Sequence, residues 1–321
     1  MNFFKPKFWD KNKISFFSVL LFPASLLIKA LSLLRRFVIK THQSSIPIIC
    51  VGNIYLGGTG KTPLSIEIFS ILKSLNMNPV FIRKRYDAFQ DEASLQKKVG
   101  PIYQDKRRSE ALKKAIQSKA DIAILDDGFQ DFSVNKNLSI VCFNEKLWIG
   151  NGLTIPSGPL REHLSALKRA DCVVINGKKN IDIESKILSK NNKIKIFYTR
   201  YKAQNIGEFK NKSVIAFAGI GNPENFFNLL KYNNINIIKE IKFPDHYKYS
   251  EEEIKNLIEK AKNDNAILLT TEKDYFRINE NYKKNIYYLK INTEIEDQNK
   301  LIEEIKKIIW KLLDIFLSSW A

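Results

Sequence analysis

Apolar residues in this chain form short continuous runs, separated by stretches in which they recur every three or four positions. The short runs are rich in Val and Ile and have the length of buried strands. They lie at 46–51, 79–82, 121–125, 138–143 and 172–175. The intervening spacing predicts helices over 62–77 and 109–118. Strands that alternate with helices predict a mostly parallel sheet covered on both faces.

The same alternation begins again near Lys212. It predicts strands at 213–217, 235–241, 266–269 and 285–290, and helices at 223–232, 251–262 and 301–320. Residues 198–211 are punctuated by Lys, Asn and Gly, so we expect a linker there. Because 321 residues can hold two modest domains, we predict an α/β fold with a larger first part and a second, smaller α/β lobe.

An apolar segment precedes the first strand, and Ile14 to Ile28 carries no charge. It is shorter than the ~20 residues of a spanning helix, and Pro23 would bend it. We expect a bent helix at a membrane interface rather than a signal peptide; a helix buried in the core is the alternative. Phe16, Phe17, Leu20, Leu21, Leu27 and Leu31 would enter the acyl boundary, and Lys29, Arg35, Arg36 and Lys40 would face headgroups.

Composition narrows the class of protein only a little. Apolar content of 44% and charged content of 27% are those of an ordinary globular chain. The net charge of +18 suits anionic lipid and nucleotide as well as nucleic acid, and the sequence has no arginine-rich tract, so we expect no nucleic-acid partner. Cys50, Cys142 and Cys172 lie in apolar runs without CxxC spacing, which predicts buried free thiols in a reducing cytoplasm.

A glycine-rich loop follows the first strand and opens the first helix. A strand, a glycine turn and Lys-Thr at a helix start are what backbone N–H groups need to surround a polyphosphate. Lys61 would reach the outer phosphates, and the Thr62 hydroxyl can hold Mg²⁺. We therefore expect a P-loop NTPase-like core that binds a nucleoside triphosphate through Tyr55, Leu56, Gly57, Gly58, Thr59, Gly60, Lys61 and Thr62. The usual loop has glycine at the position of Tyr55, so this loop is a variant.

Other residues could carry chemistry. Asp126 and Asp127 end a hydrophobic strand, where an NTPase needs an acidic Mg²⁺ partner, although Asp-Asp-Gly can also be a plain turn. Asp91 and Glu92 lie in a polar stretch, and such a pair is usually solvated surface. His246 follows a strand; a lone loop histidine is more often structural, but one paired with a carboxylate would serve proton transfer.

Further short motifs accompany these residues in order along the chain. They are Val51-Gly52-Asn53, Gly57 to Pro63, Asp91-Glu92, Asp126 to Gln130, Gly150-Asn151-Gly152, Pro156 to Glu162, Leu167 to Asp171, Ala218 to Pro223, Phe243 to His246 and Thr270 to Asp274. Together they resemble the tetraacyldisaccharide 4'-kinases, the lipid A 4'-kinases of Gram-negative bacteria. The resemblance covers nearly the whole chain, its Gly-Pro-Leu-Arg-Glu block is highly specific, and the family tolerates a residue such as Tyr55 in the loop.

The resemblance implies transfer of the ATP γ-phosphate to the 4'-hydroxyl of a tetraacyldisaccharide 1-phosphate, which forms lipid IVA. It implies a monotopic enzyme at the cytoplasmic face of the inner membrane. By matching motifs, Lys61 and Thr62 bind phosphate and Mg²⁺, and Asp126 and Asp127 serve the metal. Asp91 and His246 would form the acid–base pair, with Glu92 at the metal or substrate. The expected divisions are a membrane-associating helix at 1–40, a P-loop kinase core at 41–205 and the second lobe at 206–321.

The sequence departs from the family pattern at several places, which bear on the substrate rim more than on the phosphate chemistry. It has Arg83 to Tyr86 where Ser-Arg-Gly-Tyr is common, Ala93 after Asp-Glu, Asp131 after Gly-Phe-Gln and Tyr247 after His246. The rival function is a regulatory nucleotide switch that binds a protein partner. The Asn-Lys-x-Asp signature of guanine-nucleotide switches does not match the spacing of Thr271 to Asp274.

Overall fold

A computed structural model describes residues 6–11, 13–85 and 90–318 of the chain, with the backbone alone at 90–91 and 311–318. The described residues divide into two compact units. The larger comprises 6–85, 99–200 and 295–318, and the smaller comprises 90–98 and 201–294. The division points at 200 and 294 fall within strands β7 and β12. Residues 90–98 lie in the stretch expected to form the core, yet they cluster with the smaller unit.

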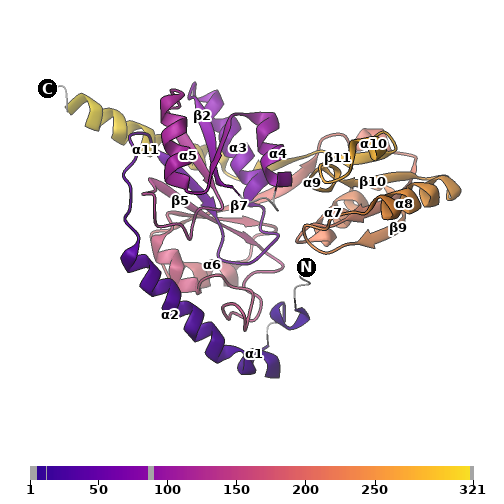
Figure 1. Cartoon of the computed structure of the whole chain (residues 1–321), viewed down its shortest axis with the longest axis horizontal. Helices are drawn as coiled ribbons and strands as arrows, with labels where there is room; N and C mark the ends of the chain where they lie inside the picture. Colours follow the sequence, from indigo (N-terminus) through magenta and orange to yellow (C-terminus); the bar gives the residue numbers. More distant parts are fainter. Residues whose placement is uncertain (1–5, 12, 86–89, 319–321) are drawn as a thin grey trace. The chain divides into compact units, whose positions relative to one another are not determined.

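A parallel sheet forms the centre of the larger unit (Figure 1). Its order is β12 (Ile291–Ile295), β7 (Lys195–Ala203), β6 (Cys172–Asn176), β5 (Leu138–Asn144), β1 (Ile48–Gly52), β4 (Ile122–Asp126), β2 (Pro79–Lys84) and β3 (Ile102–Asp105). Each recorded pairing from β7 to β3 is parallel, as predicted. The expected linker at 198–211 is wrong at its start, because residues 198–203 continue β7, whose pairing with β6 reaches Thr199.

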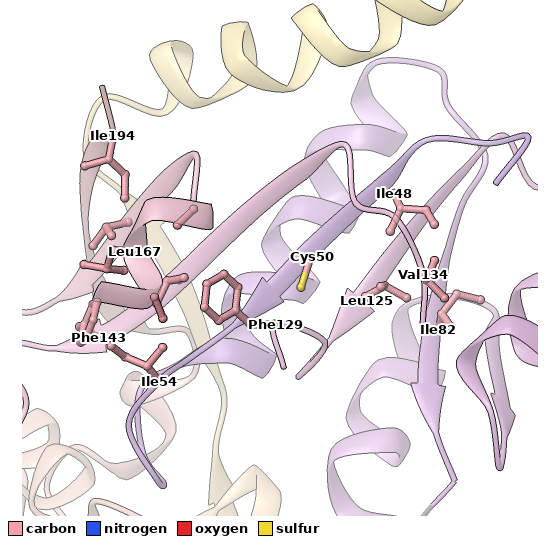
Figure 2. Close-up of a cluster of buried hydrophobic side chains, with 14 of the residues drawn as sticks. Ile48, Cys50, Ile54, Ile82, Leu125, Phe129, Val134, Phe143, Leu167 and Ile194 are labelled. Atoms are coloured by element: carbon pink, nitrogen blue, oxygen red, sulfur yellow. The ribbon is translucent and has the colours of Figure 1, made fainter. Parts of the chain in front are cut away.

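The alternating faces of the strands create two cores. Along β1, Ile48 and Cys50 belong to one cluster and Ile49 and Val51 to the other. The first cluster, drawn in Figure 2, includes apolar residues of α5 (Arg108–Gln117) and α6 (Ile181–Leu188). The second includes those of α3 (Lys61–Ser74) and α11 (Gln298–Ser318). All five residues of β1 are buried, as expected for a central parallel strand.

The smaller unit repeats this architecture on a smaller scale. Its sheet has the order β11 (Ile286–Leu289), β10 (Ile267–Thr271), β8 (Ser213–Ala218) and β9 (Asn236–Lys242), with parallel pairings throughout. Helix α7 (Pro223–Tyr232) packs into one cluster and α8 (Glu251–Asn263) into the other. The remaining helices of this unit are α4 (Gln90–Val99), η3 (Ile206–Phe209), α9 (Glu272–Tyr275) and α10 (Glu280–Lys283). In the larger unit, η2 (Leu164–Arg169) precedes β6.

In the N-terminal apolar segment, polar side chains are buried and most of the large apolar side chains are exposed. After the short helix η1 (Lys7–Trp9), it forms α1 (Phe16–Leu20) and α2 (Phe22–Val38), separated just before Pro23 as the proline predicts. The buried residues of these two helices are Ser18 and Ser25. Large apolar side chains point outward instead, and those more than half exposed are Phe16, Phe17, Val19, Leu20, Leu26, Leu27, Leu31, Leu34, Phe37 and Val38. The alternative of a buried core helix is therefore wrong.

Polar contacts of the serines attach these helices to the larger unit. Ser25 donates to the carbonyl oxygen of Thr154 at 2.9 Å and lies 2.8 Å from the Ser157 hydroxyl, while Asn151 donates to Ser18 at 3.1 Å. Arg36 pairs with Glu162 and lies over the Phe132 ring, so it has partners within the protein, and its expected headgroup role stays a prediction. Within the described stretches, every helix is too short or too polar to cross a bilayer.

Candidate active-site residues

The glycine-rich loop connects β1 to α3, and three of its glycines have a backbone that L side chains rarely adopt. Gly57, Gly58 and Gly60 have φ values of 96°, 28° and 87°. Gly60 caps α3, so the helix begins at Lys61. The first N–H groups of a helix lack intrahelical partners and create positive potential. This loop therefore presents the anion-binding geometry that the sequence predicts.

Tyr55 shows why this loop does not need glycine at its position. Tyr55 is not among the described residues whose φ is positive, so its backbone is open to residues other than glycine. Its ring is fully buried, and its hydroxyl donates to Asp10 Oδ1 at 2.6 Å. Burial and the neighbouring Asp10 raise the pKa of the Tyr55 phenol above its ordinary value, so it remains a donor. Tyr55 thus anchors the loop through its side chain rather than contacting a phosphate with it.

Hydrogen bonds from a side chain and from the backbone fix the conformation of the phosphate-binding loop. The buried Asn53 side chain donates to the Tyr55 carbonyl at 2.5 Å and to Thr59 Oγ1 at 3.0 Å. The N–H of Leu56 donates to the Pro159 carbonyl at 2.9 Å. The Gly-Pro-Leu-Arg-Glu block therefore lies directly against the phosphate-binding loop, although its residues are about 100 positions away along the chain.

Asp126 brings the end of β4 to the start of α3. Its Oδ2 accepts from Thr62 Oγ1 at 3.3 Å and from Arg83 Nη1 at 2.7 Å. The Asp126 and Arg83 side chains are 0% and 7% exposed, so this is a buried ion pair. A hydroxyl and a carboxylate side by side are hard oxygen donors of the kind that Mg²⁺ prefers. The pair Thr62 and Asp126 therefore fits the expected magnesium ligands.

Asp127 has a left-handed backbone conformation, with φ of 56°. This turn places its carboxylate Oδ1 3.6 Å from Lys61 Nζ and 2.7 Å from Arg161 Nη1. A left-handed non-glycine residue costs energy and is often found at functional sites. The cations Lys61, Arg83 and Arg161 therefore surround two carboxylates, those of Asp126 and Asp127. The excess positive charge of this group favours binding of an anionic polyphosphate.

Arg108, a buried residue at the start of α5, donates hydrogen bonds to the acidic turn, by which we mean Asp126, Asp127 and Gly128. Its Nη2 donates to the Asp127 carbonyl at 2.7 Å and its Nη1 to Asp131 Oδ2 at 2.8 Å. Burial acts to raise the pKa of Asp131, but hydrogen bonds from Ser133 and the Arg108 charge outweigh it, so that pKa lies below its ordinary value. Asp131 is thus a partner of Arg108 in this protein. Sequence reasoning missed Arg83, Arg108 and Arg161 as site residues.

The second candidate group lies in the smaller unit, around His246. This residue also has a left-handed backbone, with φ of 56°, and its N–H donates to the Gly219 carbonyl at 3.1 Å. Its ring nitrogens Nε2 and Nδ1 lie 3.4 Å from Lys273 Nζ and 3.4 Å from Arg277 Nη2. Lys273 also donates to Glu92 Oε1 at 2.9 Å. The predicted residues Glu92 and His246 therefore share one lysine.

Asp91, the expected partner of His246, lies at the start of α4 beside Glu92, and its side chain is outside the described part of the structure. Its role remains a prediction. The described side chains also contain no group of three or more His, Cys, Asp or Glu with metal-binding geometry. The expected metal residues of the larger unit are instead one hydroxyl and carboxylates, a set that leaves room for phosphate and water ligands.

Comparison with known proteins agrees with these motifs. The chain is 43% identical over 307 residues to a tetraacyldisaccharide 4'-kinase of Pelagibacter ubique, which spans 95% of this chain and 98% of the relative. It is 35% identical over 322 residues to one of Rickettsia bellii, covering 94% of this chain and 98% of the relative. Among solved structures, the LpxK protein of Aquifex aeolicus in complex with ATP shares the fold with a TM-score of 0.69 at 24% identity, covering 91% of this chain and 99% of that one.

A family-level match extends over most of the sequence. Residues 17–310 match the family described as LpxK, Tetraacyldisaccharide-1-P 4'-kinase. This span includes the phosphate-binding loop, the acidic turn and the His246 group. The chain therefore belongs to the tetraacyldisaccharide-1-P 4'-kinase family.

Proposed function

We propose that this protein is an ATP-dependent lipid kinase that transfers the γ-phosphate to the 4'-hydroxyl of a tetraacyldisaccharide 1-phosphate to form lipid IVA. The observation that carries the proposal is the arrangement of Lys61, Thr62, Asp126 and Asp127 in a chain of this family. ATP as the donor is supported by the nucleotide bound to the Aquifex aeolicus relative. The functional parts we propose are the membrane-associating helix at 1–40, the kinase core at 41–205 and the second lobe at 206–321.

In the larger unit, the chain's own residues would bind and orient the nucleotide. The loop N–H groups from Gly57 to Thr62 would surround the phosphates, and Lys61 would lie beside the group that is transferred. Arg161 holds the Asp127 carboxylate in place at 2.7 Å, so Asp127 is preorganised. Phosphoryl transfer depends mainly on positioning and on neutralisation of charge, and these are the two effects this site provides.

Thr62 and Asp126 would hold Mg²⁺, with Asp127 beside them. Glu92 pairs with Lys273 within the smaller unit, and its expected role at the metal or substrate stays a prediction. When bound, Mg²⁺ neutralises charge on the phosphates and helps to align them. Arg83 holds the buried Asp126 carboxylate in one orientation, because the two groups are hydrogen-bonded at 2.7 Å and almost fully removed from solvent.

In the smaller unit, His246 and Asp91 would orient the acceptor hydroxyl and remove its proton. His246 is suited to this role because its backbone is fixed in an uncommon conformation by the hydrogen bond to Gly219. The hydroxyl oxygen would attack the γ-phosphorus as the bond to the β,γ-bridging oxygen breaks. The products would be the 4'-phosphorylated lipid and ADP, with the hydroxyl proton on the acid–base pair.

A membrane surface is the second partner we propose. The exposed apolar side chains of α1 and α2 would enter the acyl region of a bilayer, and the exposed Lys29, Arg35 and Lys40 of the same segment would meet anionic headgroups. We place the protein at the cytoplasmic face of the inner membrane as a monotopic enzyme. Helix α2 has 17 residues, which suits a helix lying in the interface.

The rival proposal, a regulatory nucleotide switch, is not favoured because the relatives are kinases by name. The deciding experiment incubates purified protein with [γ-³²P]ATP, Mg²⁺ and detergent-solubilised tetraacyldisaccharide 1-phosphate. A kinase labels the lipid in proportion to the ADP formed. Release of free phosphate without labelled lipid would exclude the kinase and favour the switch. Lys61→Met serves as the inactive control.

A further inference from the structure

Arg36, in the last turn of α2, contacts the body of the larger unit with its side chain. Its guanidinium pairs with Glu162, and its Cζ lies 4.4 Å from the centre of the Phe132 ring. The Arg36 side chain is 29% exposed, whereas its neighbour Arg35 is classed with the fully exposed residues of the helix. Two adjacent arginines of the proposed membrane helix therefore have different surroundings.

Glu162 is a common partner of two arginines. Its Oε2 accepts from Arg36, and both of its carboxylate oxygens lie 3.0 Å from Arg169 Nη2. Because the Glu162 side chain is only 12% exposed, its charge is poorly hydrated and needs these cations. The Arg169 guanidinium lies 4.6 Å from the centre of the Phe129 ring, and Phe129 directly follows the acidic turn. Glu162 thus connects α2 to the residue next to that turn.

Glu162 also adjoins the residue that holds Asp127. Arg161 donates from Nη1 to Asp127 Oδ1 at 2.7 Å, and its N–H donates to the Ile54 carbonyl at 2.7 Å. Since one peptide bond joins residues 161 and 162, a displacement of Glu162 also displaces Arg161. A shift of about 1 Å at a group that takes part in catalysis can lower the rate by about 10²-fold. The partners of Glu162 therefore bear on the position of Asp127.

The chain beyond α2 is fixed to the same region by other bonds. Thr41 Oγ1 donates to the Phe132 carbonyl at 2.9 Å, and the N–H of His42 donates to the Ser133 carbonyl at 2.9 Å. These bonds do not involve the Arg36 side chain. A substitution of Arg36 therefore removes its ion pair and leaves these attachments of the chain in place.

We propose that Arg36 is a positioning residue for phosphoryl transfer, which holds Asp127 in place through Glu162 and Arg161. The last turn of the membrane-associating helix then supports the phosphate-binding site, and Arg35 rather than Arg36 meets anionic headgroups. This inference rests on the proposed kinase function and on the proposed place of Asp127 beside the nucleotide.

The first test measures labelling of detergent-solubilised tetraacyldisaccharide 1-phosphate by full-length variants. Arg36→Met removes the charge but retains an apolar stem beside Phe132. It should lower kcat by about 5- to 20-fold, with the KM for ATP and for lipid within about twofold. Arg36→Lys should restore most of the kcat, because it restores the charge. The control is Arg200→Met, which removes an exposed ion pair with Glu296 and should have the kcat of wild type.

A double-mutant cycle tests whether Arg36 acts through Glu162. Glu162→Gln keeps the shape of the side chain and should lower kcat at least as much as Arg36→Met. The double variant should lose no more than Glu162→Gln alone, because both substitutions break the same pair. Losses that multiply would show that the two residues act independently and would overturn the inference.

Flotation with phosphatidylglycerol vesicles separates positioning from headgroup binding. Arg36→Met should float like wild type, whereas Arg35→Met should bind about fivefold more weakly, as expected for one basic residue at an anionic surface. Weaker flotation of Arg36→Met with an unchanged kcat, or a raised KM for lipid with an unchanged kcat, would assign Arg36 to lipid binding and overturn the inference.

Amide hydrogen exchange of the protein without ligands tests the same contacts independently of activity. Arg36→Met should accelerate exchange in peptides that cover 126–131 and 161–162, and Arg200→Met should not. Wild-type protein that labels no lipid would refute the proposed function. Wild-type exchange of both peptides in Arg36→Met would overturn the positioning role, whether or not the protein is a kinase.

Discussion

Arg161 donates from Nη1 to Asp127 Oδ1 at 2.7 Å, and its backbone N–H donates to the Ile54 carbonyl, also at 2.7 Å. One residue of the Gly-Pro-Leu-Arg-Glu block thereby joins the acidic turn to the start of the phosphate-binding loop. The left-handed Asp127 needs such support, because its backbone conformation is costly by itself. The Gly-Pro-Leu-Arg-Glu block is therefore part of the candidate site, because its arginine contacts both Asp127 and the start of the phosphate-binding loop.

We predict that Arg161→Met lowers kcat/KM by about 10- to 100-fold while the melting temperature stays close to that of wild type. Activity should fall because the Asp127 carboxylate loses its fixed partner. Stability should change little because the Arg161 and Asp127 side chains keep 25% and 30% of their surface in contact with solvent, which screens their attraction, and ion pairs near the surface contribute about 1 kcal/mol or less. Arg200→Met is the matched control, since Arg200 pairs with Glu296 at an exposed position. Equal activities of the two variants would contradict the prediction.

Local patterns were sufficient to predict β1, α3 and β4, which carry the phosphate-binding loop and the acidic pair, but not α4, which carries Asp91 and Glu92. The loop from Gly57 to Thr62 and the acidic pair after β4 were recognisable because each depends on residues adjacent in sequence. Strand β7 was not predicted at all, because exposed Arg200 and Lys202 interrupt its apolar pattern. Charged residues on a half-exposed strand make it look like a linker.

Long-range partners could not be predicted in the same way. Arg83 and Arg108 reach the acidic turn only because the parallel sheet brings β2 and the start of α5 beside β4. Nothing adjacent in sequence marks a buried arginine as such a partner. Similarly, Ser18 and Ser25 are the inward residues of helices rich in large apolar side chains, and only their contacts with 151–157 reveal this orientation.

Asp91→Ala should lower kcat by about 10²–10⁴-fold and leave ATP affinity nearly unchanged, because loss of a general base affects proton transfer and not nucleotide binding. The measurement is steady-state lipid labelling together with equilibrium binding of a non-hydrolysable ATP analogue. Asp87→Ala, which removes a carboxylate just before the motif, is the control. A decrease in kcat below roughly tenfold would count against the assignment.

The Arg108–Asp131 pair should make stability sensitive to acid. The pKa of Asp131 lies below its ordinary value in the folded protein, so the folded state binds its proton less readily than the unfolded chain. The resulting stabilisation is complete above the ordinary pKa near 4 and is lost as pH falls through the lower, folded value. We expect Asp131→Asn to reduce the free energy of unfolding by about 1–3 kcal/mol at pH 7.

This difference between wild type and Asp131→Asn should shrink when urea unfolding is repeated from pH 7 down to pH values below 4. Asp105→Asn is the comparison, because the pKa of Asp105 is also lowered, chiefly by Lys114, but the carboxylate is on the surface. A difference that is constant over the whole pH range would show that Asp131 does not act through its charge.

The three cysteines should be unreactive in the folded protein. Cys50, Cys142 and Cys172 are buried and free. Burial raises the pKa of Cys50 to about 11 and that of Cys172 to about 12, and it raises the pKa of Cys142 further. Because the thiolate is the reactive form, Ellman's reagent at pH 8 should modify none of them in native protein and all of them in guanidinium chloride. A thiol that reacts at the rate of free cysteine without denaturant would refute this.

The membrane proposal calls for point substitutions rather than removal of residues 1–36. Asp10 bonds to Tyr55, and Ser25 bonds to the 154–157 segment, so truncation would disturb the phosphate-binding loop together with the surface. We therefore choose the triple variant Phe16→Ser, Leu20→Ser and Leu27→Ser, whose side chains are 76%, 64% and 63% exposed. Half-burial of three such side chains in lipid is worth about 2–4 kcal/mol, or roughly 30- to 700-fold in partitioning.

Flotation with vesicles that contain phosphatidylglycerol measures this partitioning. The control is a second triple variant, Ile181→Ser, Leu188→Ser and Tyr232→Ser, which removes exposed apolar side chains from α6 and α7. Only the variant in α1 and α2 should lose binding, because its apolar residues lie on consecutive helices in a segment that also carries exposed basic side chains, whereas those of the control lie on α6 and α7. Raised salt should weaken the wild-type interaction in part, since Lys29 and Arg35 attract anionic headgroups and the apolar contact is insensitive to screening. Equal flotation of the two variants would locate the membrane contact elsewhere on the protein.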